Sequence, residues 1–413
     1  MLASTLVREA RRSGLPSTLA AVGSLRRYAP DIGDVSLLGI MPPGQQPHLV
    51  DAFSRLPSVT GTLERHLAGI TVATARGTAT LHVTTPEHAG SALVWHTGSK
   101  GHTGQLQSRA RHHGLTFHAG TLKSAGIATP APTEDDFYQR LGLPYIAPEL
   151  REGVDEIEAA DQGALPTLVT DLNIRGDLHM HSTWSDGRDS IDDMVQAAEE
   201  IGYEYVAMTD HSERAMAARN LSVDDVARQR DEVEEVRQRH PSIQILWGVE
   251  VDIMQDGSLD FDDRTLSQFD IVLASLHDHA GQEPPALLAR YLGAVRHPLV
   301  NVITHPAHRS PGYSEGYDLD FDRLFAAAQE TGTALEIDGA PGHLDLDGLL
   351  ARRAAAAGVT VTIDSDCHRK EAMARQMRFG IGTARRGWIE PQHVLNTRHV
   401  TTVRAFVDRK RGR

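Results

Sequence analysis

The chain has 413 residues, a net charge of −14, and 40% hydrophobic but only 5% aromatic residues. This length predicts two or three structural units, and the acidic balance argues against a protein that binds nucleic acid through overall positive charge. The single cysteine, Cys367, excludes an internal disulfide and is typical of a reducing compartment. No apolar run reaches about eighteen residues, and Arg8 and Glu9 interrupt the segment where a signal peptide would be apolar. We therefore expect a cytoplasmic protein without a membrane span.

The first half of the chain predicts a mixed α+β region. Helical segments are expected at residues 2–12 and 91–95, and strands at residues 35–40 and 79–83. Residues 127–148 are rich in proline and threonine, which predicts a linker or the closing arm of a domain.

From Leu172 onward, strand-like and helix-like segments alternate regularly. Strands are expected at residues 205–208, 243–249, 271–276, 300–304, 334–337 and 359–363. A helix should begin at the capping sequence Ser190-Ile-Asp-Asp and end near Gly202, with further helices at residues 224–239, 286–295, 321–331 and 347–357. About seven such βα units are accommodated more economically by a barrel than by an open sheet.

Nine residues of metal-ligand type recur where these strands give way to loops. They are His179, His181, Asp186, His211, Glu250, His277, His305, Asp366 and His368. A lone histidine at a strand end is more often a capping or core residue, and a lone acid is more often a helix N-cap or surface residue. Nine together at carboxyl strand ends, which meet on one face of a barrel, predict a multinuclear metal site.

Mixed nitrogen and oxygen ligands without cysteine favour Zn²⁺, Mn²⁺ or Fe²⁺. Nine ligands exceed the needs of one ion and suit two or three, with Glu250 and Asp366 as the bridging and catalytic candidates. Such a cluster activates water and neutralises charge on a phosphoryl oxygen. Arg309 could hold a phosphate oxygen as a third catalytic residue, or it could be an ordinary surface arginine.

The motifs D-L-H-M-H-S-T-W-S-D-G, T-D-H, G-V-E, S-L-H, H-P and S-D-C-H resemble those of the PHP (polymerase and histidinol phosphatase) family. The resemblance covers residues 172–400 and implies a distorted (β/α)7 TIM-like barrel. It also implies three metal positions. The first would use His179, His181, Glu250 and Asp366, the second Glu250, His277 and His305, and the third Asp186, His211 and His368.

The first half resembles the palm and thumb of bacterial family X DNA polymerases. The similar elements are G-S-L-R-R at residues 23–27, G-D-V-S at 33–36 and A-L-V-W-H-T-G-S-K-G-H at 92–102. We expect that the helix-hairpin-helix region, which normally precedes the palm, is missing. The predicted division is a degenerate palm-like region at residues 1–95, a thumb-like region and linker at 96–170, and the PHP domain at 171–413.

Departures from the polymerase pattern lie at the carboxylates that hold two Mg²⁺ ions. Asp34 is kept, but Ser36 and Thr80 stand where the other two acids are expected, so nucleotidyl transfer should fail. Thr103 and Gln107 replace the usual Asn and Arg. This degenerate nucleotidyltransferase region could still position DNA or could only support the barrel.

In the barrel, Asp338 stands where the family commonly has Asn, and His343 where it commonly has Arg. Both differences could affect substrate binding. The leading hypothesis is a metal-dependent phosphodiesterase acting as a 3′→5′ exonuclease on single-stranded DNA or primer ends, with a role in DNA repair. One alternative is a small-molecule phosphomonoesterase of the histidinol-phosphatase type, against which the polymerase-like half argues. Another is a non-catalytic DNA-binding scaffold, against which the complete set of metal ligands argues.

Overall fold

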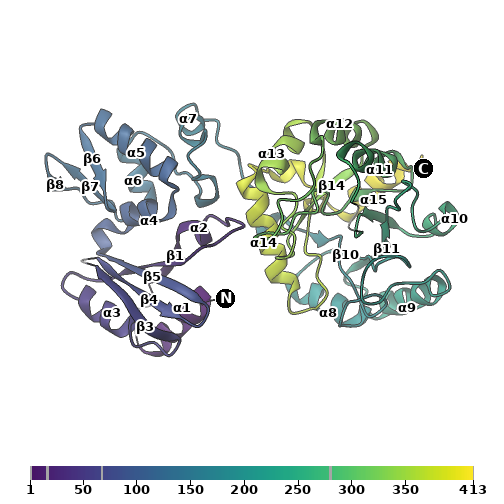
Figure 1. Ribbon diagram of the computed structural model, residues 1–413, viewed down its shortest axis with the longest axis horizontal. Helices are drawn as coiled ribbons and strands as arrows, with labels where there is room; N and C mark the ends of the chain where they lie inside the picture. The colour runs from purple at the N-terminus through teal and green to yellow at the C-terminus, as the bar shows by residue number, and fades with distance from the viewer. Residues whose placement is uncertain (1, 15–17, 67, 279–280, 413) are drawn as a thin grey trace. The chain divides into compact units, whose positions relative to one another are not determined.

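The computed structural model describes residues 2–14, 18–66, 68–278 and 281–412. The chain divides into two compact units, residues 1–165 and 166–413 (Figure 1). None of the helices within these ranges is long and apolar enough to cross a membrane.

The first part of unit 1 is built on a five-stranded sheet with the order β1-β2-β5-β4-β3. Its strands are β1 (Leu19–Val22), β2 (Val35–Ile40), β3 (Val59–His66), β4 (Gly69–Thr74) and β5 (Gly77–Thr84), with helices α1 (Leu2–Arg12), α2 (Gly23–Arg26) and α3 (Gln46–Phe53). β2 and β5 are parallel, whereas the other neighbours are antiparallel. Leu6 of α1 and Phe53 of α3 are fully buried with Leu37 and Leu81 of the sheet, so both helices are held by one apolar core.

The second part of unit 1 combines helices with a small antiparallel sheet. Its elements are η1 (Pro86–His88), α4 (Ala89–Thr97), α5 (Lys100–His112), β6 (Leu115–His118), β7 (Thr121–Ser124), β8 (Ile127–Ala128), α6 (Glu134–Arg140), η2 (Pro148–Leu150) and α7 (Glu156–Asp161). Of the two alternatives predicted for residues 127–148, the linker is wrong, because α6 begins there at a capping box on Thr133 and buries Phe137 and Tyr138. The segment belongs to the last part of unit 1, in agreement with the other alternative, the closing arm of a domain. The boundary between the two units falls after Leu165 instead.

Unit 2 contains seven parallel strands in the order β15-β14-β13-β12-β11-β10-β9. The strands are β9 (Gly176–Asp177), β10 (Tyr205–Met208), β11 (Gln244–Asp252), β12 (Ile271–Ser275), β13 (Val302–Ile303), β14 (Ala334–Asp338) and β15 (Val361–Asp364). A parallel bridge between Met180 and Cys367 brings the segment after β9 beside the segment after β15. The sheet is therefore a nearly closed barrel, and the predicted barrel and its strands are confirmed.

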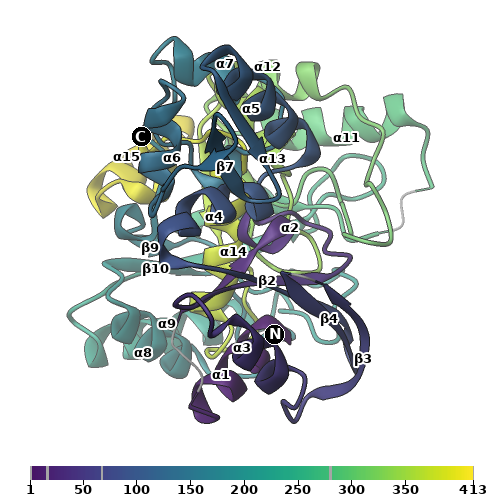
Figure 2. The same cartoon turned by 90° about the vertical axis from the view of Figure 1, so that its left-hand side faces the viewer.

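Helices surround the strands, and the view in Figure 2 shows α8 beside α9 and β9 beside β10. They are η3 (Asp171–Asn173), α8 (Ile191–Ile201), α9 (Val226–Arg239), α10 (Asp263–Leu266), α11 (Pro284–Arg296), α12 (Phe321–Thr331), α13 (Gly348–Ala356), α14 (Met373–Arg386), η4 (Pro391–His393), η5 (Leu395–Thr397) and α15 (Val400–Lys410). As predicted, α8 begins at Ser190, whose hydroxyl accepts a hydrogen bond from the Asp193 amide. It ends at Gly202, which adopts a left-handed conformation with φ of 95°.

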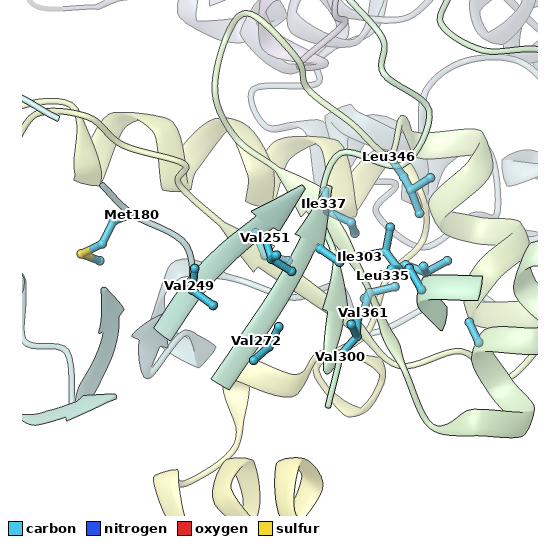
Figure 3. Close-up of a cluster of buried hydrophobic side chains, with 14 of the residues drawn as sticks. Met180, Val249, Val251, Val272, Val300, Ile303, Leu335, Ile337, Leu346 and Val361 are labelled. Atoms are coloured by element: carbon cyan, nitrogen blue, oxygen red, sulfur yellow. The ribbon is translucent and has the colours of Figure 1, made fainter. Parts of the chain in front are cut away.

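Along strands β10 to β14, alternate residues belong to two different apolar clusters. Val249, Val272, Ile303 and Leu335 lie in the cluster that the surrounding helices cover (Figure 3). Leu246, Leu273, Val302 and Ala334 form the other cluster together with Val403 and Phe406 of α15. Since side chains alternate along a strand, this second set lies on the inward face of the barrel and packs there as an apolar core.

Candidate metal centre

The alternation that buries apolar residues inside the barrel also points acids inward. Leu246 and Glu250 lie four residues apart on β11, so Glu250 faces the same side as the inward cluster. The same count from Ala334 places Glu336 and Asp338 inward on β14. These three carboxylates lie toward the carboxyl ends of their strands, and all are fully buried. The barrel mouth is therefore lined by acids that the fold removes from water.

Two histidines from the segment after β9 approach one another and two acids. The Nε2 atoms of His179 and His181 lie 3.1 Å apart. His179 Nε2 lies 3.3 Å from Glu250 Oε2, and His181 Nε2 lies 3.1 Å from Asp366 Oδ1. The period of two along an extended segment turns both imidazoles to one side, as the sequence predicted.

Glu250 occupies the middle of the donor set. Its Oε2 atom lies 2.9 Å from His211 Nδ1, and its Oε1 atom lies 3.1 Å from His305 Nε2 and 3.7 Å from His277 Nε2. The carboxylate thus faces histidines from three further strand ends. This position suits a bridging ligand.

The outer part of the donor set surrounds Asp186. Its Oδ1 atom lies 3.1 Å from His368 Nε2 and 3.6 Å from His211 Nε2. The structure therefore brings all nine predicted ligand residues into one continuous cluster.

Four groups of these side chains hold their donor atoms within 4.8 Å of one another. They are His181, Asp186, His211 and His368; His179, His181 and Asp366; His211, Glu250 and His277; and Asp338, His343 and Asp366. The first three overlap the positions that the resemblance implies, although His211 rather than His305 groups with Glu250 and His277. The fourth combines Asp366 with two residues outside the predicted set. The assignment of individual residues to individual ions stays a prediction.

The chemistry of the donors fits divalent cations. Glu250 Oε2 and Asp366 Oδ1 are buried and have no hydrogen-bond partner among the described residues. Two imidazole nitrogens facing each other at 3.1 Å cannot both act as donors. A cation between these groups would satisfy the oxygens and nitrogens together. His305 and Asp366 also adopt left-handed backbone conformations, with φ of 27° and 47°, which is the local strain that often occurs at functional sites.

The electrostatics of the cluster keep its two central acids ionised. Burial alone would raise the pKa of Glu250, but His179, His277 and His211 hold that pKa well below its usual range. Burial and the neighbouring His211 and His368 lower the pKa of His181 to about 3, so its ring is neutral. Ionised carboxylates and a neutral His181 are in the forms that bind metal ions. Although burial alone would lower them, neighbouring carboxylates raise the pKa of His277 and of His368 to about 9, so these two rings would release a proton when they bind an ion.

Three buried acids that the sequence analysis did not single out orient these ligands. Glu336 Oε1 lies 2.6 Å from His179 Nδ1, and Asp252 Oδ1 lies 3.2 Å from His277 Nδ1. In both cases the partner on Nδ1 leaves Nε2 to face the cluster. Asp210 accepts hydrogen bonds from the amides of Ser182 and Ser185, which fixes the loop between His181 and Asp186. The inward alternation of L-E-I-D on β14 is the signal that could have identified Glu336.

Arg309 is only 7% exposed, so it is not an ordinary surface arginine. Its Nη1 atom lies 3.5 Å from the Leu344 carbonyl oxygen, and its amide donates to Asp345 Oδ2 at 3.2 Å. The residue follows His305 in the loop after β13. A role in holding phosphate stays a prediction.

In unit 1, the positions of the expected polymerase carboxylates lie side by side. Ser36 of β2 pairs directly with Thr80 of β5. The Ser36 hydroxyl donates to Asp34 Oδ2 at 3.0 Å, and the Thr80 hydroxyl lies 3.1 Å from that of Thr71. Only Asp34 offers an anionic oxygen in this trio, so the two-metal arrangement lacks most of its ligands.

Comparisons with known proteins match both units. Residues 177–338 match the PHP domain, and residues 92–152 match the DNA polymerase beta thumb. The chain is similar to the DNA polymerase/3′-5′ exonuclease PolX of Bacillus subtilis, with 38% identity over 328 residues that cover 79% of this chain and 57% of that protein. A probable phosphatase of Thermoanaerobacter sp. is 30% identical over 205 residues, covering 46% of this chain and 78% of that protein. A probable phosphatase of Syntrophotalea carbinolica is 27% identical over 246 residues, covering 57% and 97% respectively.

Proposed function

We propose that the barrel of this chain, which belongs to the PHP family of metal-dependent phosphoesterases, is a 3′→5′ exonuclease acting on single-stranded DNA or primer ends. The observation that carries the proposal is the convergence of nine donor residues around Glu250 in a chain that also carries a polymerase beta thumb. The chain spans 57% of the length of the Bacillus subtilis relative, whose name includes a 3′-5′ exonuclease. A role in DNA repair forms part of the proposal.

The residues of the barrel mouth would have different roles in this reaction. Glu250 and Asp366 would bridge two or three divalent ions, with Mn²⁺, Zn²⁺ and Fe²⁺ as the candidates that suit mixed nitrogen and oxygen ligands. When bound, such ions lower the pKa of water and neutralise charge on a phosphoryl oxygen. Glu336 and Asp252 hold His179 and His277 in the orientation that binding requires. Arg309 would hold a further phosphate oxygen of the terminal nucleotide.

Degradation of labelled DNA tests this function. The whole chain is freed of metal, loaded with Mn²⁺ and incubated with 5′-labelled single strands and primed duplexes. We expect a ladder of shortened products that is lost in Asp366→Asn. Full-length DNA after incubation with protein of demonstrated metal content would contradict the proposal. It would leave a small-molecule phosphomonoesterase or, if the chain still binds DNA, a DNA-binding scaffold as the remaining hypotheses.

A phosphomonoesterase is the second candidate, because two of the similar proteins are named probable phosphatases. The barrel chemistry would be the same, but the substrate would be a small phosphate ester. Release of phosphate from small monoesters at rates far above the rate of DNA cleavage would favour this candidate. The thumb-like region argues against it, since a free phosphatase has no use for that region.

We also infer that unit 1 no longer carries out nucleotidyl transfer. Ser36 and Thr80 are paired in register but supply hydroxyl groups instead of carboxylates. Incubation of the chain with a primed template, nucleoside triphosphates and Mg²⁺ or Mn²⁺ should give no extension. Extended primers would overturn this inference without affecting the proposal for the barrel.

A further inference from the structure

The fourth donor group of the barrel mouth has no place among the three metal positions that the PHP resemblance implies. Asp338, His343 and Asp366 each offer one ligand atom, and these atoms lie within 4.8 Å of one another. We propose that these three residues form an additional divalent-cation position, which shares Asp366 with the main cluster. It would take Mn²⁺ or Zn²⁺, since one imidazole and two carboxylates suit those ions.

Asp338 is the strongest part of this site. The side chain is fully buried at the carboxyl end of β14, on the face that points into the barrel. Its Oδ1 atom accepts a hydrogen bond from the Ala340 amide at 2.6 Å, whereas Oδ2 has no hydrogen-bond partner among the residues described. A buried carboxylate oxygen without a partner is costly, and metal coordination is one of the few ways in which proteins satisfy it.

His343 completes the group from the loop that follows β14. Its amide donates to the Ala340 carbonyl at 3.0 Å, so a tight turn brings the imidazole back toward the strand end. The ring stacks on His305 of the main cluster, with centroids 4.9 Å apart and an interplanar angle of 20°. Its Nδ1 atom is buried and has no hydrogen-bond partner in the described part of the chain. The imidazole is thus held in place with one nitrogen free for coordination.

The backbone around the group is fixed by hydrogen bonds. The Asp338 amide donates to the Asp345 carbonyl at 2.5 Å, and the Asp345 carboxylate accepts from the amides of Ala307 and Arg309. The loop after β14 and the loop after β13 are therefore tied together beside Asp366. Three protein ligands leave coordination positions open, which a substrate oxygen could fill.

Metal content is the direct test, with the whole chain freed of metal and then equilibrated with Mn²⁺ or Zn²⁺. Asp338→Asn and His343→Gln should each bind one ion fewer per chain than the native protein. His297→Gln is the matched control, because His297 is a histidine outside the barrel mouth that pairs with Asp263. We expect this control to keep the native number of ions.

Crystals soaked with Mn²⁺ or Zn²⁺ give a second measurement that does not depend on a variant folding. Anomalous density between Asp338, His343 and Asp366 would support the site. Its absence at saturating metal, or equal metal content in the native and both variant chains, would overturn it. The inference rests only on the part of the proposed function that concerns metal binding. An additional ion without DNA cleavage would refute the nuclease alone, whereas DNA cleavage with unchanged ion content would refute the additional site alone.

Discussion

The barrel mouth and the polymerase-like sheet are both sites where strand ends should present metal-binding acids, but only the barrel keeps them. In the sheet, Ser36 and Thr80 are half-buried, and both hydroxyls make hydrogen bonds to neighbouring side chains. In the barrel, Glu250 and Asp366 are buried, and each has an oxygen without a hydrogen-bond partner among the described residues. The two hydroxyls of the sheet bond to Asp34 and Thr71 without any cation, whereas the acids of the barrel face imidazole nitrogens and keep a buried oxygen that a cation would satisfy.

The comparison indicates which contacts of the sheet do not depend on the expected carboxylates. The register between β2 and β5 depends on backbone hydrogen bonds and on buried residues such as Leu37 and Leu81. None of these contacts needs a carboxylate at Ser36 or Thr80. Removal of two anions from a partly exposed sheet therefore costs the fold little, although it removes the metal ligands.

The sharpest test of the comparison exchanges an acid in each region. Asp366→Asn should lower the rate of DNA cleavage at least ~100-fold, because the change removes a shared ligand whose oxygen faces His181 at 3.1 Å. Asp34→Asn is the matched control in unit 1, since Asp34 is the one acid left of its trio, and it should leave the rate unchanged. Cleavage rate and metal content are measured on the same samples. Equal losses in the two variants would show that the sheet still contributes to catalysis.

A second test concerns the buried ion pairs that stabilise unit 1. Glu134 binds Arg151 at 2.5 Å and Arg26 at 2.6 Å, and Arg151 is completely buried. Glu134→Gln should destabilise unit 1 by about 3 kcal/mol, because it leaves a buried guanidinium without its counter-ion. Asp51→Asn, which breaks the exposed pair with Arg65, is the matched control and should change little. Hydrogen exchange measured by mass spectrometry, peptide by peptide, separates unit 1 from the barrel.

The same carboxylate gives unit 1 a dependence on pH. Burial alone would raise the pKa of Glu134, but Arg151 and Arg26 lower it below its usual value. The ion pair therefore stabilises the folded unit above the pKa of an unfolded glutamate, and the stabilisation is lost as pH falls through the lowered pKa. Glu134→Gln should reduce this acid sensitivity. An unchanged pH profile in the variant would refute the assignment.

A third test weakens the barrel through an orienting residue. Glu336→Gln keeps the shape of the side chain but replaces the carboxyl group whose oxygen faces His179 Nδ1 at 2.6 Å. Metal affinity should fall roughly 10- to 100-fold, as expected for loss of a carboxylate behind a ligating histidine. Asp322→Asn, which breaks an exposed pair with Arg353, serves as the control. Saturating Mn²⁺ should restore cleavage in Glu336→Gln, and failure of this rescue would show that Glu336 does more than position His179.

Much of the barrel could be predicted from the sequence, because its signals are local. The predictions for β10 and α12 match the observed bounds, since runs of Val, Ile and Ala and helix-capping residues mark each element by itself. The helix α6 was missed because proline and threonine surround it, and because it is stabilised by the burial of Phe137 and Tyr138, with Phe137 against the ring of Phe117. Tertiary contacts, and not local propensity, therefore determine the secondary structure of that segment.

The candidate site divides in the same way. The nine ligand residues could be predicted because each lies at a strand end. The alternation on β14 could place Glu336 inside the barrel, but not opposite His179, because that pairing joins residues 157 positions apart in the chain. The resemblance to the PHP family also marked Asp338 and His343 as departures from the residues common at those positions. Their closeness to Asp366 follows only from the order of the strands in the barrel.

The prediction with the smallest expected effect on rate tests which substrate the barrel prefers. Tyr313 is 94% exposed at the tip of a hairpin in the loop between β13 and α12, where Ser310 and Ser314 pair. Because this loop leaves the carboxyl end of a barrel strand, its tip is suited to stacking on a base of bound DNA. Tyr313→Ala should lower kcat/KM on single-stranded DNA about fivefold, which corresponds to about 1 kcal/mol of stacking.

The controls for Tyr313 distinguish the two candidate substrates. Leu172 is 92% exposed and precedes β9 at the opposite end of its strand, so Leu172→Ala should leave DNA cleavage unchanged. Hydrolysis of p-nitrophenyl phosphate, which has no base, should be the same in Tyr313→Ala and the native chain. Equal losses on DNA and on the small ester would mean that the tyrosine supports the loop instead of the base. In that case the exposed face of the barrel mouth would no longer favour DNA over a small phosphate ester.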